Sequence, residues 1–329
     1  MSVHTDDKHW VLLYYCFTPI DEPAAFRKFH HLYCIDLDLR GRIIIAPEGI
    51  NGTVSGTEVA CKKYMASLKE NPQFKDIHFK VDTSNHSAFQ KLNVRLKKEI
   101  VYAGLPTIKP YEKTGKHITP LELKELQGKE EIILLDARSN YEHRVGKFKG
   151  AVTLDINHFR EFPSKIDELI PYKDKKIVTY CTGGVKCEKT SAYLLEQGFK
   201  EVYQLHGGIV QYGIDTNGED FEGKCYVFDN RLTVNINKKN PSVISQCHIC
   251  KTISDRMINC ANPTCNAHIP MCTTCGEQME GACSASCQKN PKKRFYDGTG
   301  YYITRMNGYN PNKGVRRKIY MESQQKAVC

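Results

Sequence analysis

The segment 177–197 constrains the fold most strongly, because an apolar run, a glycine-containing loop and a helix-like stretch follow one another in it. The loop reads Cys181-Thr182-Gly183-Gly184-Val185-Lys186-Cys187. Glycines let backbone N–H groups turn towards one point, and the N-terminus of the next helix adds partial positive charge. Such settings lower a cysteine pKa to roughly 3.5–7.5. The pattern predicts a strand–loop–helix unit with a reactive thiolate at Cys181, and a small buried cysteine beside a turn is the alternative.

The residues around this loop predict a parallel sheet with helices on its faces. Strand-like runs occur at 132–135, 177–180 and 202–205, and helical stretches separate them. The run Thr119-Pro120-Leu121-Glu122 is a capping box, so a helix is expected to begin there. Gly198 fits the left-handed position that ends the helix after the loop. Ligands collect at the carboxyl ends of parallel strands, and Cys181 follows one such end.

The first hundred residues predict a smaller α+β domain. We expect strands at 11–16, 42–46, 53–55, 77–81 and 94–102, with helices at 22–33 and 57–69. Asn51-Gly52 is a good reversal signal between the second and third strands, and Thr57 is a good helix N-cap. The order β-α-β-β-α-β is the split βαβ, ferredoxin-like arrangement. That fold hosts many functions, so a scaffold or dimerisation role and a nucleic-acid contact are equally good interpretations.

The third part of the chain contains eight cysteines in four close pairs within 41 residues: Cys247, Cys250, Cys260, Cys265, Cys272, Cys275, Cys283 and Cys287. Two tetrahedral zinc sites with four thiolates each require this number. Few aliphatic residues occur in the same segment, so metal binding would have to supply its folding energy. We therefore expect two structural zinc ions. An iron–sulfur cluster and a set of reduced thiols on a loop are the alternatives.

The spacing leaves the pairing of these ligands open. The cysteines could be used in sequence, or they could be crossed so that the first pair, Cys247 and Cys250, shares a metal with the third pair. His248 and His268 are spare candidates that we expect to be bystanders. A catalytic role for one of the metals is not excluded by the sequence, although a structural role is the expectation.

The excess of positive charge is concentrated near the C-terminus. Lysine and arginine outnumber acidic residues 47 to 37, and nine basic residues but one acid lie between Lys289 and Lys318. Aromatic residues are interleaved with these cations, which suits single-stranded RNA because cations meet phosphates and rings stack on unpaired bases. A solvated tail with packed tyrosines is the alternative. The residues predicted to contact RNA are Lys292, Lys293, Arg294, Tyr296, Arg305, Arg316, Arg317 and Lys318.

Composition also limits the class of protein. No apolar run approaches the length of a membrane helix and the N-terminus is polar, so we expect a soluble, cytoplasmic protein without membrane association. Fifteen cysteines in such a chain indicate metal binding and catalysis rather than a disulfide framework. No flavin or nicotinamide motif is visible, and nothing in the sequence indicates an oligomeric state. We expect three domains, at 1–105, 117–218 and 223–329.

Two groups of residues flank the loop at 181–187 in the order of a known domain. Upstream are Asp136-Ala137-Arg138, Glu142 and Gly150-Ala151, and downstream is the segment 205–209, Leu-His-Gly-Gly-Ile. This pattern resembles the rhodanese domain, with its Asp-x-Arg…Glu…Gly-Ala motif and a six-residue active loop that begins at cysteine. In this chain that loop would run from Cys181 to Lys186, and the resemblance covers about a hundred residues.

All three parts in this order resemble the bacterial tRNA uridine hydroxylases. The segment 46–55, Ala-Pro-Glu-Gly-Ile-Asn-Gly-Thr-Val-Ser, the segment 181–188, with its Cys-Thr-Gly-Gly-x-x-Cys-Glu pattern, and the cysteine-rich region carry the resemblance. It implies conversion of wobble uridine in the tRNA anticodon loop to 5-hydroxyuridine, with molecular oxygen as co-substrate. It places the catalytic cysteine at Cys181 and the second loop cysteine at Cys187. Where arginine is expected, the chain has Lys186, which keeps the charge but loses the planar fork.

The chemical roles of these residues stay open at the level of sequence. Hydroxylation at C5 of uracil needs an oxidant, and a nucleophile that adds at C6 would activate the ring. A thiolate at Cys181 could be that nucleophile or a carrier of activated oxygen or sulfur. Cys187 is expected to pack rather than to resolve an oxidised Cys181. Arg138, Glu142 and Lys186 are expected to organise the loop by ion pairing, with Asp136 in support.

Two other functions compete with hydroxylation. A sulfurtransferase would use the same loop to hold a persulfide on Cys181, so the loop itself does not discriminate. A non-catalytic RNA-binding or adaptor protein would use the rhodanese-like domain only as a scaffold. The two further domains and the basic, aromatic tail favour the hydroxylase, because a small sulfur carrier has no need of them.

Overall fold

The computed structural model describes residues 8–129 and 131–300. These residues divide into two compact units, 8–100 and 101–300. No helix within the described ranges combines the length and the apolar composition that crossing a membrane requires.

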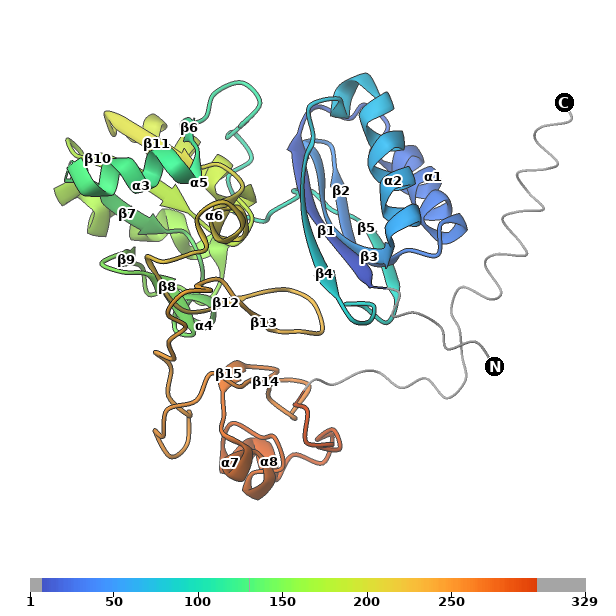
Figure 1. The fold of residues 1–329 in the computed structure, drawn as a ribbon, viewed down its shortest axis with the longest axis vertical. Helices are drawn as coiled ribbons and strands as arrows, with labels where there is room; N and C mark the ends of the chain where they lie inside the picture. Colours follow the sequence, from blue (N-terminus) through green and yellow to red (C-terminus); the bar gives the residue numbers. More distant parts are fainter. Residues whose placement is uncertain (1–7, 130, 301–329) are drawn as a thin grey trace, which may run out of the picture. The chain divides into compact units, whose positions relative to one another are not determined.

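The first unit is a five-stranded sheet with two helices on one face (Figure 1). Its strands are in the order β4-β1-β3-β2-β5, and β5 runs parallel to β2 while the other neighbours are antiparallel. The elements are β1 (His9–Phe17), α1 (Pro23–Asp36), β2 (Arg40–Ala46), β3 (Gly49–Thr57), α2 (Glu58–Glu70), the 3-10 helix η1 (Pro72–Phe74), β4 (His78–Ser84) and β5 (Leu92–Leu96). The first four strands and two helices form the predicted ferredoxin-like arrangement, and β5 extends it.

Of two local predictions in this unit, the helix N-cap is confirmed and the turn is wrong. The Thr57 hydroxyl accepts a hydrogen bond from the Ala60 N–H at 3.2 Å, so the predicted N-cap is confirmed. The turn predicted at Asn51-Gly52 is wrong, because Ala46 pairs with Gly49 and both predicted turn residues lie inside β3. Gly52 has a packing role instead: a side chain at this position would collide with the hydroxyl of Tyr14, which is fully buried beneath it.

The second unit contains a parallel sheet in the order β6-β11-β10-β7-β9. Its first elements are β6 (Lys116–Ile118), α3 (Pro120–Lys129), β7 (Ile133–Asp136), α4 (Asn140–His143), β8 (Gly146–Phe148), β9 (Val152–Thr153), the 3-10 helix η2 (Phe159–Tyr172), β10 (Lys176–Tyr180), α5 (Val185–Glu196), β11 (Glu201–Leu205) and α6 (Gly208–Thr216). The predicted parallel α/β architecture is therefore confirmed.

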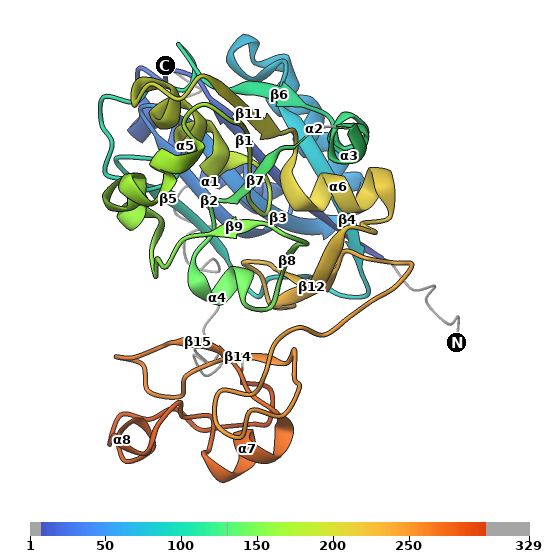
Figure 2. The ribbon, with the colours of Figure 1, turned by 90° about the vertical axis from the view of Figure 1, so that its left-hand side faces the viewer.

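Alternate side chains of this sheet enter two separate cores. Leu134 and Val178 pack with residues of α3 and α6 on one face, whereas Leu135 and Ile177 pack with residues of α5 and η2 on the other. Figure 2 shows α5 on one side of the strands and α3 with α6 on the other. The predicted capping box at Thr119 is present, since Thr119 and Glu122 exchange backbone-to-side-chain hydrogen bonds of 2.6 and 3.2 Å.

The remainder of this unit is built from short elements. A three-stranded antiparallel sheet in the order β13-β12-β8 joins β12 (Phe221–Tyr226) and β13 (Thr233–Asn235) to β8. Beyond it lie the hairpin β14 (Met257–Asn259) and β15 (His268–Pro270), and the short helices α7 (Thr273–Gln278) and α8 (Ala285–Gln288). The two small cores here combine four buried cysteines with only three large apolar side chains, Ile258, Ile269 and Met271, and one alanine. This agrees with the expectation that apolar burial alone does not hold the segment together.

Candidate active site and metal centres

The active loop lies between the end of β10 and the start of α5. Gly184 is the N-cap of α5 and has φ +100°, a conformation that favours glycine. The carbonyl of Cys181 accepts the Ile209 N–H at 3.0 Å, which ties the loop to α6. Cys181 is only 2% exposed, so neighbouring backbone and side-chain atoms cover most of its surface.

This surrounding stabilises a thiolate on Cys181. The Gly184 N–H points at Sγ from 3.1 Å. Burial alone would disfavour the charged form, but a hydrogen bond from Cys187, the positive charge of Lys186 and backbone N–H groups together lower the pKa of Cys181 to about 6. The sulfur is therefore mostly ionised at neutral pH, as the glycine-containing loop predicted.

Cys187 is fully buried in the first turn of α5. Burial, together with the hydrogen bond to Cys181, raises the pKa of Cys187 well above its ordinary value. It is therefore a neutral thiol that donates to the thiolate. Cys187 is packed, and it also contributes directly to the electrostatics of Cys181.

Asp136 and Arg138 form an ion pair that is completely buried. The guanidinium donates from Nε and Nη2 to the two carboxylate oxygens, at 2.8 and 2.6 Å, and Nη2 also donates to the Gly146 carbonyl at 2.7 Å. Burial opposes the charge, but Asp136 holds the pKa of Arg138 well above its usual range. The pair thus fixes the segment between β7 and β8 beneath the loop, and Arg138 carries a permanent charge there.

Glu142 and Lys186 form a second ion pair beside the loop. Lys186 Nζ lies 2.5 Å from Glu142 Oε2, and the two side chains are 12% and 0% exposed. The same Glu142 oxygen accepts the Ser139 N–H at 3.1 Å, so it also caps α4. A single carboxylate therefore connects α4 to the lysine that stands where arginine was expected.

Two further residues near the loop, Gly208 and Cys225, were not among the predicted site residues, although Gly208 belongs to the segment 205–209 that carries the rhodanese resemblance. Gly208 has φ +65°, and a Cβ there would lie 2.8 Å from the Gly184 nitrogen and 2.9 Å from the Thr182 carbonyl. The Thr182 hydroxyl donates to the Tyr226 carbonyl at 3.3 Å, and the buried Cys225 thiol lies near the same hydroxyl. The glycine pair Gly207-Gly208 was a visible signal, but β12 carries no motif that points to the loop.

Aromatic rings surround the outer side of the loop. Lys186 Nζ lies 5.9 Å from the ring centres of both Phe159 and Phe228. Tyr226 stacks edge to face with Phe228, at 5.3 Å between ring centres. The Tyr226 hydroxyl also lies 2.6 Å from Nδ1 of His268, on β15, so the cysteine-rich segment packs directly against the strand that supports the loop.

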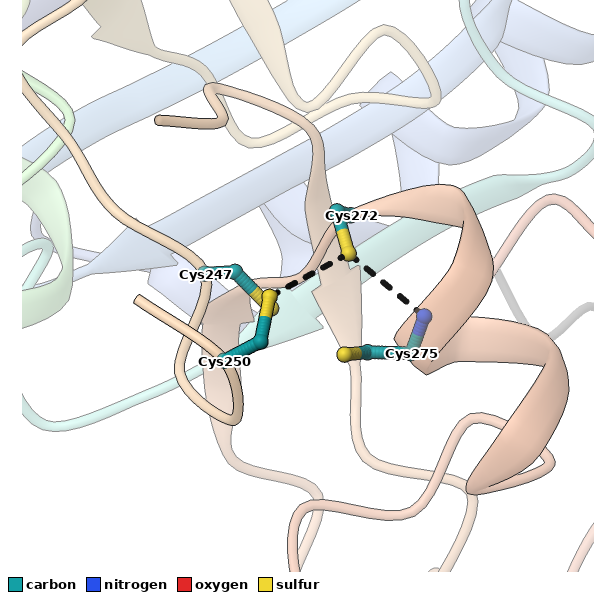
Figure 3. Close-up of side chains that lie close together, drawn as sticks. All are labelled: Cys247, Cys250, Cys272 and Cys275. Carbon is teal, nitrogen blue, oxygen red and sulfur yellow. Dashed lines mark hydrogen bonds between the residues drawn. The ribbon is translucent and has the colours of Figure 1, made fainter. Parts of the chain in front are cut away.

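The eight clustered cysteines form two groups of four. One group is Cys247, Cys250, Cys272 and Cys275, and the other is Cys260, Cys265, Cys283 and Cys287; within each group the sulfur atoms lie within 4.8 Å of one another. The pairs are thus crossed, one of the two arrangements that the sequence left open. In Figure 3 the four side chains of the first group point towards a common centre.

The sulfur spacing fits a tetrahedral metal ion. A Zn–S bond of about 2.3 Å places the corners of a tetrahedron about 3.8 Å apart. The Sγ–Sγ distances are 3.7 Å for Cys250–Cys272, 3.7 Å for Cys265–Cys283 and 3.6 Å for Cys283–Cys287. Backbone N–H groups also point at sulfurs, as from Cys275 to Cys272 at 3.4 Å. Both groups can hold a metal, and the described cysteines are free thiols.

The basic stretch after the second group is described only in part. Arg294 donates from Nε to the Ala261 carbonyl at 3.1 Å and from Nη2 to the Asn266 side chain at 2.7 Å. Lys293 pairs with Glu280, and the Tyr296 hydroxyl contacts Arg256 at 2.5 Å. Lys292 is exposed. The other predicted RNA contacts, Arg305, Arg316, Arg317 and Lys318, lie outside the described residues.

Family models match three successive parts of the chain. A family described as UPF0176 acylphosphatase like domain matches residues 9–100, the rhodanese-like domain family matches 119–215, and a family described as rhodanase C-terminal matches 222–288. A crystal structure of a rhodanese-like domain protein from Staphylococcus aureus is similar at 23% identity and a TM-score of 0.26, and covers 31% of this chain and 94% of that chain.

Curated relatives match nearly the whole chain. A tRNA uridine(34) hydroxylase from Cytophaga hutchinsonii is 58% identical over 307 residues, which cover 93% of this chain and 98% of the relative. A tRNA uridine(34) hydroxylase from Enterococcus faecalis is 46% identical over 292 residues, which cover 88% of this chain and 92% of the relative.

Proposed function

The chain belongs to the tRNA uridine(34) hydroxylase family, and we propose on that premise that it hydroxylates C5 of the wobble uridine in the tRNA anticodon loop, forming 5-hydroxyuridine. One observation supports a catalytic role for the active loop most directly. Cys181 has a pKa of about 6 and sits in a cradle of N–H donors, beside a lysine and a second cysteine. A sulfur that is ionised at neutral pH is a nucleophile and is readily oxidised, and either property serves hydroxylation.

Molecular oxygen is the proposed co-substrate. One oxygen atom would enter the base at C5, and the second would be reduced to water by two electrons from a donor. In this scheme the thiolate of Cys181 either adds at C6 of uracil to activate the ring or carries the activated oxygen. Asp136, Arg138, Glu142 and Lys186 hold the loop through their two ion pairs, and Cys187 stabilises the thiolate.

The two groups of cysteines would hold zinc ions with a structural role. Four thiolates per group are the donor set that zinc prefers, and the sulfur spacing supports a closed tetrahedral site that leaves no open position for substrate. Bound zinc would supply folding energy to the cysteine-rich segment. The His268 side chain of this segment contacts the Tyr226 hydroxyl. The three predicted domains, 1–105, 117–218 and 223–329, would then act as one enzyme in the cytoplasm.

The basic tail is the proposed site of phosphate contact with tRNA. Within the described residues, exposed Lys292 is suited to this role, and the neighbouring Phe295 is 87% exposed. Arg294 and Tyr296 have contacts within the chain, so any contribution they make to RNA binding would be shared with holding the cysteine-rich segment.

Nucleoside mass spectrometry tests the proposal. A bacterial strain that lacks its own hydroxylation pathways for this uridine is complemented with the wild-type gene, a Cys181→Ser allele or a Cys225→Ser allele. Cys225 is a matched control, because it is also buried beside the loop but burial raises its pKa to about 12. We expect 5-hydroxyuridine with the wild type and Cys225→Ser, and none with Cys181→Ser. Absence of the nucleoside with the wild type would refute the proposed function.

The sulfurtransferase alternative is less well supported. The same loop could hold a persulfide, but the curated relatives that span almost the whole chain are named hydroxylases. A sulfurtransferase would transfer sulfur from thiosulfate to cyanide in a Cys181-dependent way and would leave the nucleoside content of tRNA unchanged.

A further inference from the structure

A nucleobase cannot reach the sulfur of Cys181 while it remains stacked on its neighbours in an RNA loop. Cys181 is only 2% exposed. Enzymes that modify a base take it out of the stack, and bases splayed out of RNA loops are commonly received by aromatic side chains. An exposed ring close to the active loop is therefore the feature to look for.

Phe228 is such a ring. Among the described residues, the rings of Phe159 and Phe228 lie near Lys186 of the loop, and Phe159 is only 7% exposed. Phe228 is 42% exposed, and its ring centre lies 5.9 Å from Lys186 Nζ. A lone exposed phenylalanine is ordinary on a protein surface, so its position beside the thiolate's lysine is what distinguishes it.

The backbone holds Phe228 firmly in this position. The Thr182 hydroxyl, next to Cys181 in the chain, donates to the Tyr226 carbonyl at 3.3 Å. The turn that follows is closed by the Val227 N–H, which donates to the Leu232 carbonyl at 2.9 Å. Inside the turn, Arg231 donates to both oxygens of buried Asp229, at 2.9 and 2.7 Å. The exposed ring is thus presented on a braced turn that is hydrogen-bonded to the active loop.

We propose that Phe228 is the stacking platform for the uracil presented to Cys181, and that it forms with Lys186 a nucleobase subsite at the edge of the loop. The inference rests on the proposed function and deepens it. The ligand class is an unpaired pyrimidine in an RNA loop. Lys186, held by Glu142, places its ammonium group beside the ring, and Phe228 supplies the apolar face.

Binding of two RNA probes tests this subsite. The probes are an anticodon stem-loop with uridine at position 34 and the same stem-loop with an abasic site there, and the dissociation constants are measured by fluorescence anisotropy. The ratio of the two constants reports the contribution of the base alone. Stacking of one base supports a ratio of roughly 5- to 150-fold for the full-length wild-type protein.

We expect Phe228→Ala to reduce this ratio to near one and Phe228→Trp to preserve it, because tryptophan keeps a stacking face. Phe29→Ala, at a more exposed phenylalanine on the first unit, is the matched control and should keep the wild-type ratio. Alkylation of Cys181 by iodoacetamide should proceed at the wild-type rate in Phe228→Ala, which shows that the loop is intact.

The outcomes separate this inference from the proposed function. If the wild type forms 5-hydroxyuridine in cells but Phe228→Ala keeps the full ratio, or the wild type shows no preference for the probe with the base, the subsite is refuted and the hydroxylase is not. If the wild type forms no 5-hydroxyuridine, the proposed function fails and the subsite fails with it.

Discussion

Replacing Gly208 by alanine tests whether α6 supports the active loop. The backbone of Gly208 has φ +65°, which costs an alanine about 1–2 kcal/mol. Its Cβ would also lie 2.8 Å from the Gly184 nitrogen and closer still to the Cys181 carbonyl. These are backbone atoms that cannot rotate away, so overpacking adds about 1–3 kcal/mol. Gly208→Ala should therefore lower the free energy of unfolding by about 2–5 kcal/mol, and a shift of the active loop would relieve part of this strain.

Gly150→Ala is the matched control. Gly150 has φ +72°, and a Cβ there meets nothing within 4 Å. It therefore suffers the same backbone strain without the collision. Thermal unfolding should place the midpoint of Gly208→Ala roughly 2–12 °C below that of Gly150→Ala. Displacement of the Gly184 N–H from Cys181 should also raise the pKa of the thiol and slow its alkylation in Gly208→Ala alone. Equal melting temperatures and equal alkylation rates in the two variants would refute the proposed support.

Other predictions concern the thiolate and the metals. Alkylation of Cys181, followed by peptide mass spectrometry, should rise with pH around a midpoint near 6, because the protonated thiol below its pKa is unreactive; a midpoint near the ordinary value of 9.0 would contradict the cradle. Lys186→Met should raise that midpoint, and a rise of one pKa unit would slow alkylation at pH 6 about fivefold. Cys187→Ala should raise it as well, whereas Cys187→Ser keeps a donor and should raise it less; an unchanged midpoint in Cys187→Ala would mean that no hydrogen bond is made. The purified protein should contain two zinc ions, and Cys272→Ser should lose one of them; metal analysis that finds neither zinc nor iron would dismiss both centres.

The sequence predicted best those features that a few neighbouring residues determine. The caps at Thr57 and Thr119 need only a hydroxyl and backbone groups within three residues, and both were found where expected. The Asn51-Gly52 signal failed because Gly52 is required by a distant side chain, Tyr14, rather than by a turn. Contacts between residues close in sequence could be predicted, but packing between neighbouring strands of the sheet could not.

The candidate site likewise combines residues that are close in sequence with residues that only the fold brings together. The active loop is contiguous, so its cysteine, glycines and cation could be identified together. Gly208 and Phe228 reach the loop only because α6 and β12 fold back to it. The crossed pairing of the cysteines could not be chosen beforehand, because four similar pairs admit either arrangement until β14 and β15 bring the first pair to the third.

Growth under isotopic oxygen tests the central claim most directly. The complemented strain is supplied with 18O2 in ordinary water, and the nucleosides of its tRNA are measured by mass spectrometry for the wild type and for Cys181→Ser. We predict 5-hydroxyuridine that is two mass units heavier with the wild type and no 5-hydroxyuridine with Cys181→Ser. Unlabelled 5-hydroxyuridine with the wild type, or labelled product that persists with Cys181→Ser, would contradict oxygen-dependent hydroxylation by the thiolate of the active loop.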